Sequence, residues 1–148
     1  MNQPTIFLVE DNPDDVELTL KVLQDHHFHA HVEVARDGAE AVAFLTGAKK
    51  SLRGKWPPHV ILLDLNLPKL PGLAVLRHLR NDPLMACTPV IVLTTSDDAH
   101  ECDECYNEGA TSFIRKPVAY EQFEKVIQQL GHYWLDLNMP PPRKIQGL

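Results

Sequence analysis

Short runs of apolar residues recur along the chain, and segments with helical spacing separate them. Three of the runs, residues 6–9, 60–63 and 90–93, are continuously apolar rather than alternating. A continuous apolar run of this length is typical of a strand buried on both faces of a parallel sheet. We expect five strands, over residues 6–9, 32–34, 60–63, 90–93 and 112–114.

The segments between these runs carry apolar residues three or four positions apart, which is the spacing of one helix face. Asn12, Pro13 and two acids open the first segment, as is typical of a helix N-terminus. Strands that alternate with helices predict an α/β fold, a doubly wound parallel sheet covered on both faces. We expect five helices, over about residues 13–25, 39–45, 73–79, 97–108 and 123–130, the last of them continuing as far as Leu135 in one interpretation. The composition of residues 47–58 predicts an exposed loop, and that of residues 139–148 predicts a loose tail.

Polar side chains stand where four of the strands end. They are Glu10 and Asp11 after the first strand, Asp64 after the third, Thr94 after the fourth and Lys116 after the fifth. Ligands of open parallel sheets bind beyond the carboxyl ends of the strands, so we expect these groups to converge. Taken singly, each has an ordinary interpretation as a helix cap, a turn residue or a solvated charge.

Together the four strand ends favour phosphoryl-transfer chemistry. Crowded carboxylates repel one another unless a cation lies between them, and hard oxygen ligands suit Mg²⁺. A carboxylate can also act as a nucleophile toward phosphorus. The ammonium of Lys116 and the hydroxyl of Thr94 can bind phosphoryl oxygens, and phosphoryl transfer needs mainly positioning and charge neutralisation.

Composition narrows the class of protein. The chain has 148 residues, about one domain by length, and 14 Lys+Arg against 20 Asp+Glu give a net charge of -6. This charge disfavours nucleic-acid binding. Three cysteines argue against a disulfide framework. No signal peptide and no membrane-spanning apolar run is recognisable, so we expect a cytoplasmic protein.

The strand-end motifs resemble the receiver domain of two-component response regulators. Asp64 is followed 30 residues later by Thr94, and Thr94 is followed 22 residues later by Lys116, as in that family. The resemblance covers about residues 4–132 and implies a flavodoxin-like fold with strand order 2-1-3-4-5. It is carried by the Glu10-Asp11 pair, Asp64 within VILLDLNLPKLPG, Thr94 within PVIVLTT, and Lys116-Pro117.

The resemblance implies a role for each site residue. Asp64 would be the phosphoacceptor, which takes its phosphoryl group from a histidine kinase. Asp11, Asp64 and the backbone carbonyl of Asn66 would bind Mg²⁺, and Glu10 would assist through water. Lys116 would contact the phosphoryl group.

Further residues match the family's loops. Thr94 and Phe113 match the switch pair, in which the hydroxyl moves toward the phosphate and the ring turns inward. Gly72 matches the loop glycine, and a cis bond is implied between Lys116 and Pro117. Thr95 stands where the family often has Ala, a departure that would slow or reshape access to the phosphate.

The C-terminal stretch HYWLDLNMPPPR, the insertion over residues 47–58 and the stretch TTSDD resemble a narrower group. These are the small response regulators that partner cyanobacterial and bacterial phytochrome histidine kinases. We therefore expect a receiver domain over residues 1–135 and a Pro-rich extension over residues 136–148 without an output domain. Output would come through protein–protein contacts.

Four apolar residues near the C-terminus have no obvious place in a receiver core that is complete near Leu130. Exposed apolar patches mark interfaces. We favour a homodimer formed by the last helix, strand five and the extension, with folding back onto the same subunit as the alternative. The four residues are Tyr133, Trp134, Leu135 and Leu137.

Three other features favour ordinary interpretations. The His-rich residues 26–31 favour a surface loop over a metal site. Cys102 and Cys105 lie in the middle of a predicted helix, whereas a redox pair with this spacing opens one. A small basic cluster favours solvation over partner contact; it consists of Lys49, Lys50, Arg53 and Lys55.

Alternatives to a phosphoacceptor remain open. An aspartate-nucleophile phosphatase of the haloacid-dehalogenase kind has a D-x-D motif after its first strand, whereas this chain has Asp64-x-Asn66 after the third. A flavin-binding module has the same strand order but needs a phosphate-cradling loop in place of residues 11–15. A receiver-like domain that takes no phosphate is the third alternative. We expect a phosphoacceptor that loses its phosphoryl group slowly and is not a turnover enzyme.

Overall fold

The computed structural model describes residues 3–47 and 57–142. Five parallel strands form one sheet in the order β2-β1-β3-β4-β5, so the predicted fold class and strand order are confirmed. Each predicted strand ends within one residue of its observed bounds. The strands are β1 (Thr5–Val9), β2 (His31–Ala35), β3 (Val60–Leu63), β4 (Val90–Thr94) and β5 (Ser112–Arg115).

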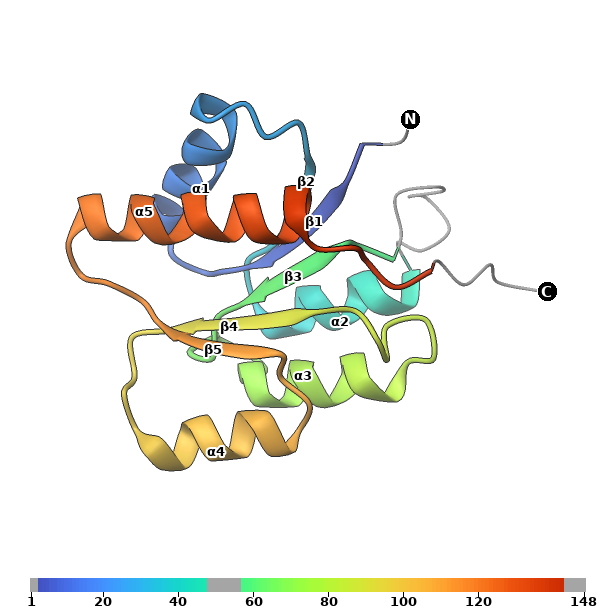
Figure 1. Ribbon diagram of the computed structural model, residues 1–148. Coiled ribbons are helices and arrows are strands. Elements are labelled where there is room, and N and C mark those ends of the chain that lie inside the picture. Colours follow the sequence, from blue (N-terminus) through green and yellow to red (C-terminus); the bar gives the residue numbers. More distant parts are fainter. Residues whose placement is uncertain (1–2, 48–56, 143–148) are drawn as a thin grey trace.

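Helices cover both faces of the sheet, with α1 and α5 on one face and α2, α3 and α4 on the other (Figure 1). They are α1 (Pro13–Asp25), α2 (Gly38–Gly47), α3 (Gly72–Asn81), α4 (Ala99–Asn107) and α5 (Tyr120–Gly131). The predicted helix over residues 97–108 is shorter in the structure because Asp98 caps it, accepting a hydrogen bond from the backbone of His100 at 2.9 Å. Within the described residues, no helix combines the length and the apolar composition that a bilayer crossing requires.

Two apolar clusters, one on each face, explain the continuous apolar runs. Successive side chains of a strand point to opposite faces. In β1, Phe7 and Val9 belong to the cluster beneath α2, α3 and α4, whereas Ile6 and Leu8 belong to the cluster beneath α1 and α5. All five residues of β1 are buried, which explains why apolar and polar residues do not alternate along this strand.

Arg80 ties the end of α3 to the loops that precede β4 and β5. Its Nε donates to the carbonyl of Gly109 at 2.8 Å, just beyond the end of α4. One terminal nitrogen donates to the carbonyls of Met85 at 2.9 Å and Thr88 at 2.8 Å. The guanidinium thus supplies donors to loop carbonyls that lie outside the helices and strands, and it anchors the C-terminal end of α4 against α3.

A π-helical turn, η2 (His132–Leu137), follows α5 and returns part of the C-terminal stretch to the same subunit. Trp134 and Leu135 are partly buried against the cluster beneath α1 and α5, so the prediction that they lack an internal site was wrong. Gly131 explains the close packing here, since a Cβ on it would lie 2.6 Å from the ring of Phe28.

The other residues after α5 divide between exposed and packed ones. Tyr133 is 50% exposed, Leu137 73% and Met139 89%. Residues 140–142 line a narrow hollow together with Pro58 and Leu84, so this part of the predicted loose tail has neighbours in the fold. Residues 143–148 lie outside the described part of the chain.

Candidate functional site

The loop after β1 carries the acidic pair into the site. The amide of Glu10 donates to the carbonyl of Ala35 at 2.9 Å and extends the β1–β2 pairing by one residue. Asn12 then caps α1, because its side chain accepts hydrogen bonds from the amides of Asp14 at 2.9 Å and Asp15 at 3.3 Å. The amide of Asn12 donates to Glu10 Oε2 at 3.2 Å. The cap therefore also orients the Glu10 carboxylate.

Asp64 is fixed by backbone hydrogen bonds at the end of β3. Its amide donates to the carbonyl of Val9 at 3.0 Å, and its Oδ1 accepts from the amide of Asn66 at 3.1 Å. Gly72, at the start of α3, packs directly against this segment and donates to the carbonyl of Leu65 at 3.0 Å. A Cβ on Gly72 would lie 2.4 Å from the carbonyl oxygen of Asp64, so only glycine permits this approach.

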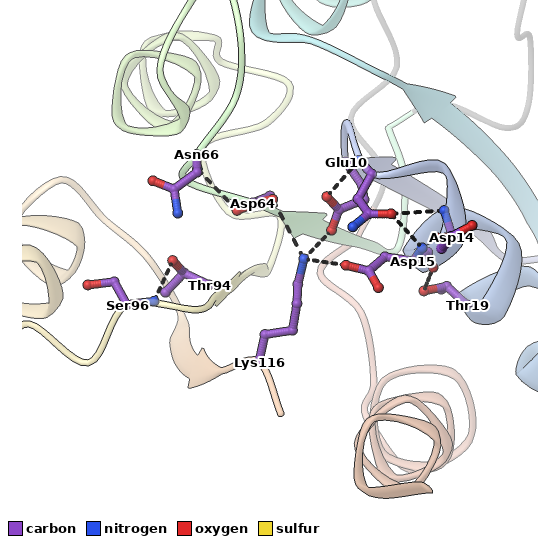
Figure 2. Close-up of polar contacts among 10 residues, drawn as sticks. Glu10, Asp14, Asp15, Thr19, Asp64, Asn66, Thr94, Ser96 and Lys116 are labelled. Carbon is purple, nitrogen blue, oxygen red and sulfur yellow. Dashed lines mark hydrogen bonds and ion pairs between the residues drawn. The ribbon is translucent and has the colours of Figure 1, made fainter. Parts of the chain in front are cut away.

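A buried ammonium lies among carboxylates from three parts of the chain (Figure 2). The amide of Lys116 donates to the carbonyl of Thr94 at 2.6 Å, which extends the β4–β5 pairing beyond β5. Its Nζ lies 2.6 Å from Glu10 Oε1, 2.9 Å from Asp15 Oδ2 and 3.6 Å from Asp64 Oδ2. Three carboxylates surround one ammonium, so the site has an excess of negative charge.

The pKa values of Glu10 and Lys116 are both raised. Burial is the main cause at Glu10, and with Asp64 beside it the pKa reaches about 7 in spite of the lowering effect of Lys116. Burial alone would lower the pKa of Lys116, but the hydrogen bonds it donates to Glu10 and Asp15 outweigh that effect. Lys116 is therefore charged at neutral pH.

Glu10, Asp11 and Asp64 form a cluster that can hold a divalent metal ion. Each offers one carboxylate oxygen, and these oxygens lie within 4.8 Å of one another. The side-chain ligands are all oxygen atoms, which favours hard cations over zinc or copper. The site thus fits a divalent ion such as Mg²⁺ or Mn²⁺. In the residues the structure describes, the histidines of residues 26–31 join no such cluster.

Thr94 and Phe113 stand at the two strands beside the carboxylates. Thr94 is fully buried, and its hydroxyl accepts a hydrogen bond from the amide of Ser96 at 3.2 Å. Phe113 is partly buried against the cluster beneath α2, α3 and α4. Thr95, the departure from the family pattern, is exposed. The roles of Thr94 and Phe113 as a switch pair stay a prediction.

Asp15 is the site residue that sequence reasoning missed. The acids at the start of α1 had a sufficient explanation in the positive end of the helix. Asp15 also reaches Lys116, as described above, while Asp14 makes no such contact in the described residues. The sequence carries no mark that separates Asp15 from Asp14; in the structure Thr19, four residues on, is buried and its hydroxyl donates to the Asp15 carbonyl at 2.7 Å.

The remaining sequence features lie away from this site. Cys102 and Cys105 both lie inside α4, and burial, with nearby acids, raises the pKa of Cys105 to about 11. A redox-active thiol has a lowered pKa, so this environment favours a structural role. The basic cluster of residues 49–55 lies outside the described part of the chain.

Comparison with known proteins gives a consistent result. The family model described as "Response regulator receiver domain" matches residues 6–128. The probable methanogenesis regulatory protein FilR2 of Methanothrix harundinacea is 32% identical over 92% of this chain and 86% of its own. Response regulator Rcp1 of Synechocystis sp. is 33% identical over 88% of each chain.

Solved structures agree with the sequence matches. The phosphorylated cyanobacterial phytochrome response regulator RcpA has a TM-score of 0.87 at 32% identity, covering 95% of this chain and 100% of its own. The Mn²⁺-bound form of Rcp1 has a TM-score of 0.85 at 32% identity, covering 94% and 99%. The Rcp1 structure holds a divalent metal ion, the class of ligand that the acidic cluster of this chain fits.

Proposed function

The chain belongs to the response regulator receiver domain family, and from this premise we propose that Asp64 accepts a phosphoryl group from a histidine kinase. The observation that carries the proposal is the position of Asp64 Oδ2, 3.6 Å from the ammonium of Lys116 and within a cluster of three carboxylates. The phosphatase and flavin alternatives find no support. Asp64 has Asn66 rather than a second acid two residues on, and acids fill the loop where a flavin phosphate would sit.

The chemistry follows from the charges. A carboxylate oxygen of Asp64 forms a bond to phosphorus while the phosphorus–nitrogen bond of a phosphohistidine breaks, and the imidazole keeps that electron pair. Negative charge spreads over the equatorial phosphoryl oxygens in the transition state. The Lys116 ammonium balances part of this charge, and Glu10 and Asp15 hold the ammonium in place.

We propose Mg²⁺ as the resident ion. Glu10, Asp11 and Asp64 would hold it together with the backbone carbonyl of Asn66. When bound, the ion neutralises charge on both the acceptor carboxylate and the incoming phosphoryl group. Since the aspartyl phosphate would be lost slowly to water, the protein would act as a signal carrier rather than as a turnover enzyme.

Thr94 and Phe113 would transmit the change. The Thr94 hydroxyl accepts a hydrogen bond from the Ser96 amide, so a move of the hydroxyl toward a phosphoryl oxygen would break this contact. The space it leaves would allow the half-buried ring of Phe113 to turn inward. The surface over α4 and β5 would change as a result, and a partner protein would read that change.

Labelling with acetyl phosphate and Mg²⁺ tests the acceptor. The native chain should gain one phosphoryl group per molecule, as measured by intact mass. Asp64→Asn should abolish the gain, while Asp103→Asn, which removes an exposed acid of α4, should leave it unchanged. Undiminished labelling of Asp64→Asn would refute the assignment.

We propose a phytochrome-type histidine kinase as the phosphoryl donor and the cytoplasm as the location. Two supports are the RcpA and Rcp1 structures, which align with nearly the whole of this chain. A purified phytochrome kinase should transfer its phosphoryl group to this chain within minutes under the activating light condition. Transfer that is equally fast from unrelated histidine kinases would count against this partner.

We also propose a homodimer through α5, β5 and the extension over residues 136–148, with the receiver domain spanning residues 1–135. Exposed apolar side chains support it, namely Tyr133, Leu137 and Met139 beyond α5 and Val118, which is 98% exposed, after β5. Trp134 and Leu135 contribute to their own subunit instead. We expect the partner contacts to be with protein and not with nucleic acid, given the net charge of -6.

Sedimentation equilibrium tests the dimer. The native chain should show a dimer whose population rises with concentration, and Leu137→Ser should weaken it without affecting the fold, because Leu137 is 73% exposed. Leu20→Ser, which changes a less exposed residue of α1, is the matched control. A native chain that remains monomeric at high concentration, with and without a phosphoryl mimic, would contradict the proposal.

A further inference from the structure

A cleft of about 310 Å³ lies between α3 and α4. Its volume falls within the range of ordinary ligand sites, about 300–1,000 Å³. Leu65, Leu73 and Ala74 form an apolar wall on the side of α3, and Glu101, Glu104 and Cys105 line the side of α4. The side of α3 is therefore apolar apart from Arg77, and the opposite side carries two carboxylates.

The far end of α4 is tied to α3 while the cleft end is not. The Nε of Arg77 lies 2.9 Å from Glu108 Oε1, and Arg80 donates to the carbonyl of Gly109. Arg77 also lines the cleft, but its partner Glu108 lies at the C-terminal end of α4. The two arginines hold that end of α4. Within the part of the chain that the structure describes, neither Glu101 nor Glu104 forms an ion pair with α3; Glu104 Oε1 lies 2.9 Å from Nε2 of the exposed His100 in α4 itself.

Glu101, which lines the cleft, has a carboxylate oxygen without a hydrogen-bond partner. Its Oε2 is buried and has no hydrogen-bond partner within the described residues. A buried carboxylate oxygen without a donor is unfavourable, and an unsatisfied group in a native fold calls for an explanation. The terminal torsion of a Glu side chain is broad, so rotation about it would let this carboxylate meet a donor placed in the cleft.

We propose that the α3–α4 cleft binds an arginine side chain presented by a partner protein. The guanidinium would pair with Glu101 and Glu104, which lie three residues apart on one face of α4. The methylene stem would lie along the wall formed by Leu73 and Ala74. A planar guanidinium offers two parallel donors to a carboxylate, which a lysine ammonium does not.

This site is separate from the acceptor chemistry, although the two are neighbours. Leu65 and Asn66 line the cleft and directly follow Asp64 in the chain. An arginine side chain in the cleft would therefore touch the segment that carries the acceptor. The binding itself requires neither Mg²⁺ nor the Asp64 carboxylate.

Nuclear magnetic resonance titration of the full chain tests the proposal. The probe is the blocked peptide acetyl-Ala-Arg-Ala-amide, with acetyl-Ala-Lys-Ala-amide as the comparison. We expect saturable amide shifts at Leu73, Ala74 and Glu101, and clearly weaker binding of the lysine peptide. Glu101→Gln should weaken binding of the arginine peptide about tenfold, which corresponds to about 1.4 kcal/mol. Glu121→Gln, an exposed acid in α5, should not.

Two further variants keep the test decisive. Ala74→Leu fills the cleft from the side of α3 and should block the peptide without any change of charge. Asp64→Asn should bind it as the native chain does, so loss of the acceptor does not imitate loss of this site. The proposal is overturned if shifts are absent or unchanged in Glu101→Gln, if the lysine peptide binds equally, or if Mg²⁺ alone produces the same shifts.

Discussion

Gly72→Ala should damage the site although it adds only one methyl group. The new Cβ would lie 2.4 Å from the carbonyl oxygen of Asp64 and 2.6 Å from the Cα of Leu65. Both contacts are with backbone, so no side-chain rotation relieves them. Either the start of α3 or the segment that carries Asp64 must move.

The distances set the size of the effect. The backbone must separate by about 1 Å to restore ordinary contact, and overpacking of this kind costs about 1–3 kcal/mol. Alanine is favoured over glycine within a helix by only about 0.5–1 kcal/mol, which does not offset the clash. A shift of about 1 Å at a reacting group can also slow a reaction about 100-fold. We therefore expect lower stability and strongly reduced phosphorylation.

Urea unfolding and the initial rate of labelling by acetyl phosphate measure the two effects. Gly131→Ala is the matched control, because its Cβ would meet the ring of Phe28 on the opposite face of the sheet. That variant should keep the native labelling rate whatever its stability. If Gly72→Ala labels at the native rate, or if both variants lose labelling equally, the reasoning about close backbone packing at Asp64 is wrong.

Three further predictions concern charge and burial. With Glu10 among the proposed Mg²⁺ ligands, binding should need its ionised form; because its pKa is raised to about 7, affinity measured by calorimetry should rise about tenfold from pH 6 to pH 8. A pH-independent affinity would contradict this shift. Cys105, with a pKa of about 11, should be alkylated by iodoacetamide at pH 8 far more slowly than exposed Cys87, as mass spectrometry can resolve; equal rates would contradict its burial. Arg80→Met should lower the free energy of unfolding by about 2–4 kcal/mol because it leaves loop carbonyls without donors. Arg77→Met, which breaks a half-exposed ion pair, should cost less than about 1 kcal/mol, and similar losses in both would contradict the anchoring role.

The sheet and its polar edge were predictable because local sequence determines them directly. In a small domain, a short continuous apolar run such as Val60–Leu63 is best buried as a central strand. The residue after it then lies at the edge of the sheet. Glu10, Asp64 and Lys116 could therefore be brought together without coordinates, and the structure confirms that they meet.

The contact of Asp15 with Lys116 and the packing of the C-terminal turn were harder to predict from the sequence, for physical reasons. An acid in the first turn of a helix is stabilised by the helix itself, so its contact with Lys116 leaves no separate mark in the sequence. Trp134 and Leu135 return to the core because Gly131 lets α5 lie against Phe28. That depends on a contact between residues about 100 positions apart, which helical periodicity does not encode.

The most direct measurement locates the phosphoryl group by peptide mass spectrometry. The chain is incubated with acetyl phosphate and Mg²⁺, and in parallel with a metal chelator. The label should lie on the peptide that contains Asp64, and the chelator should remove it. A label on another peptide, or one of equal yield without a divalent ion, would contradict the assignment of this carboxylate as the acceptor.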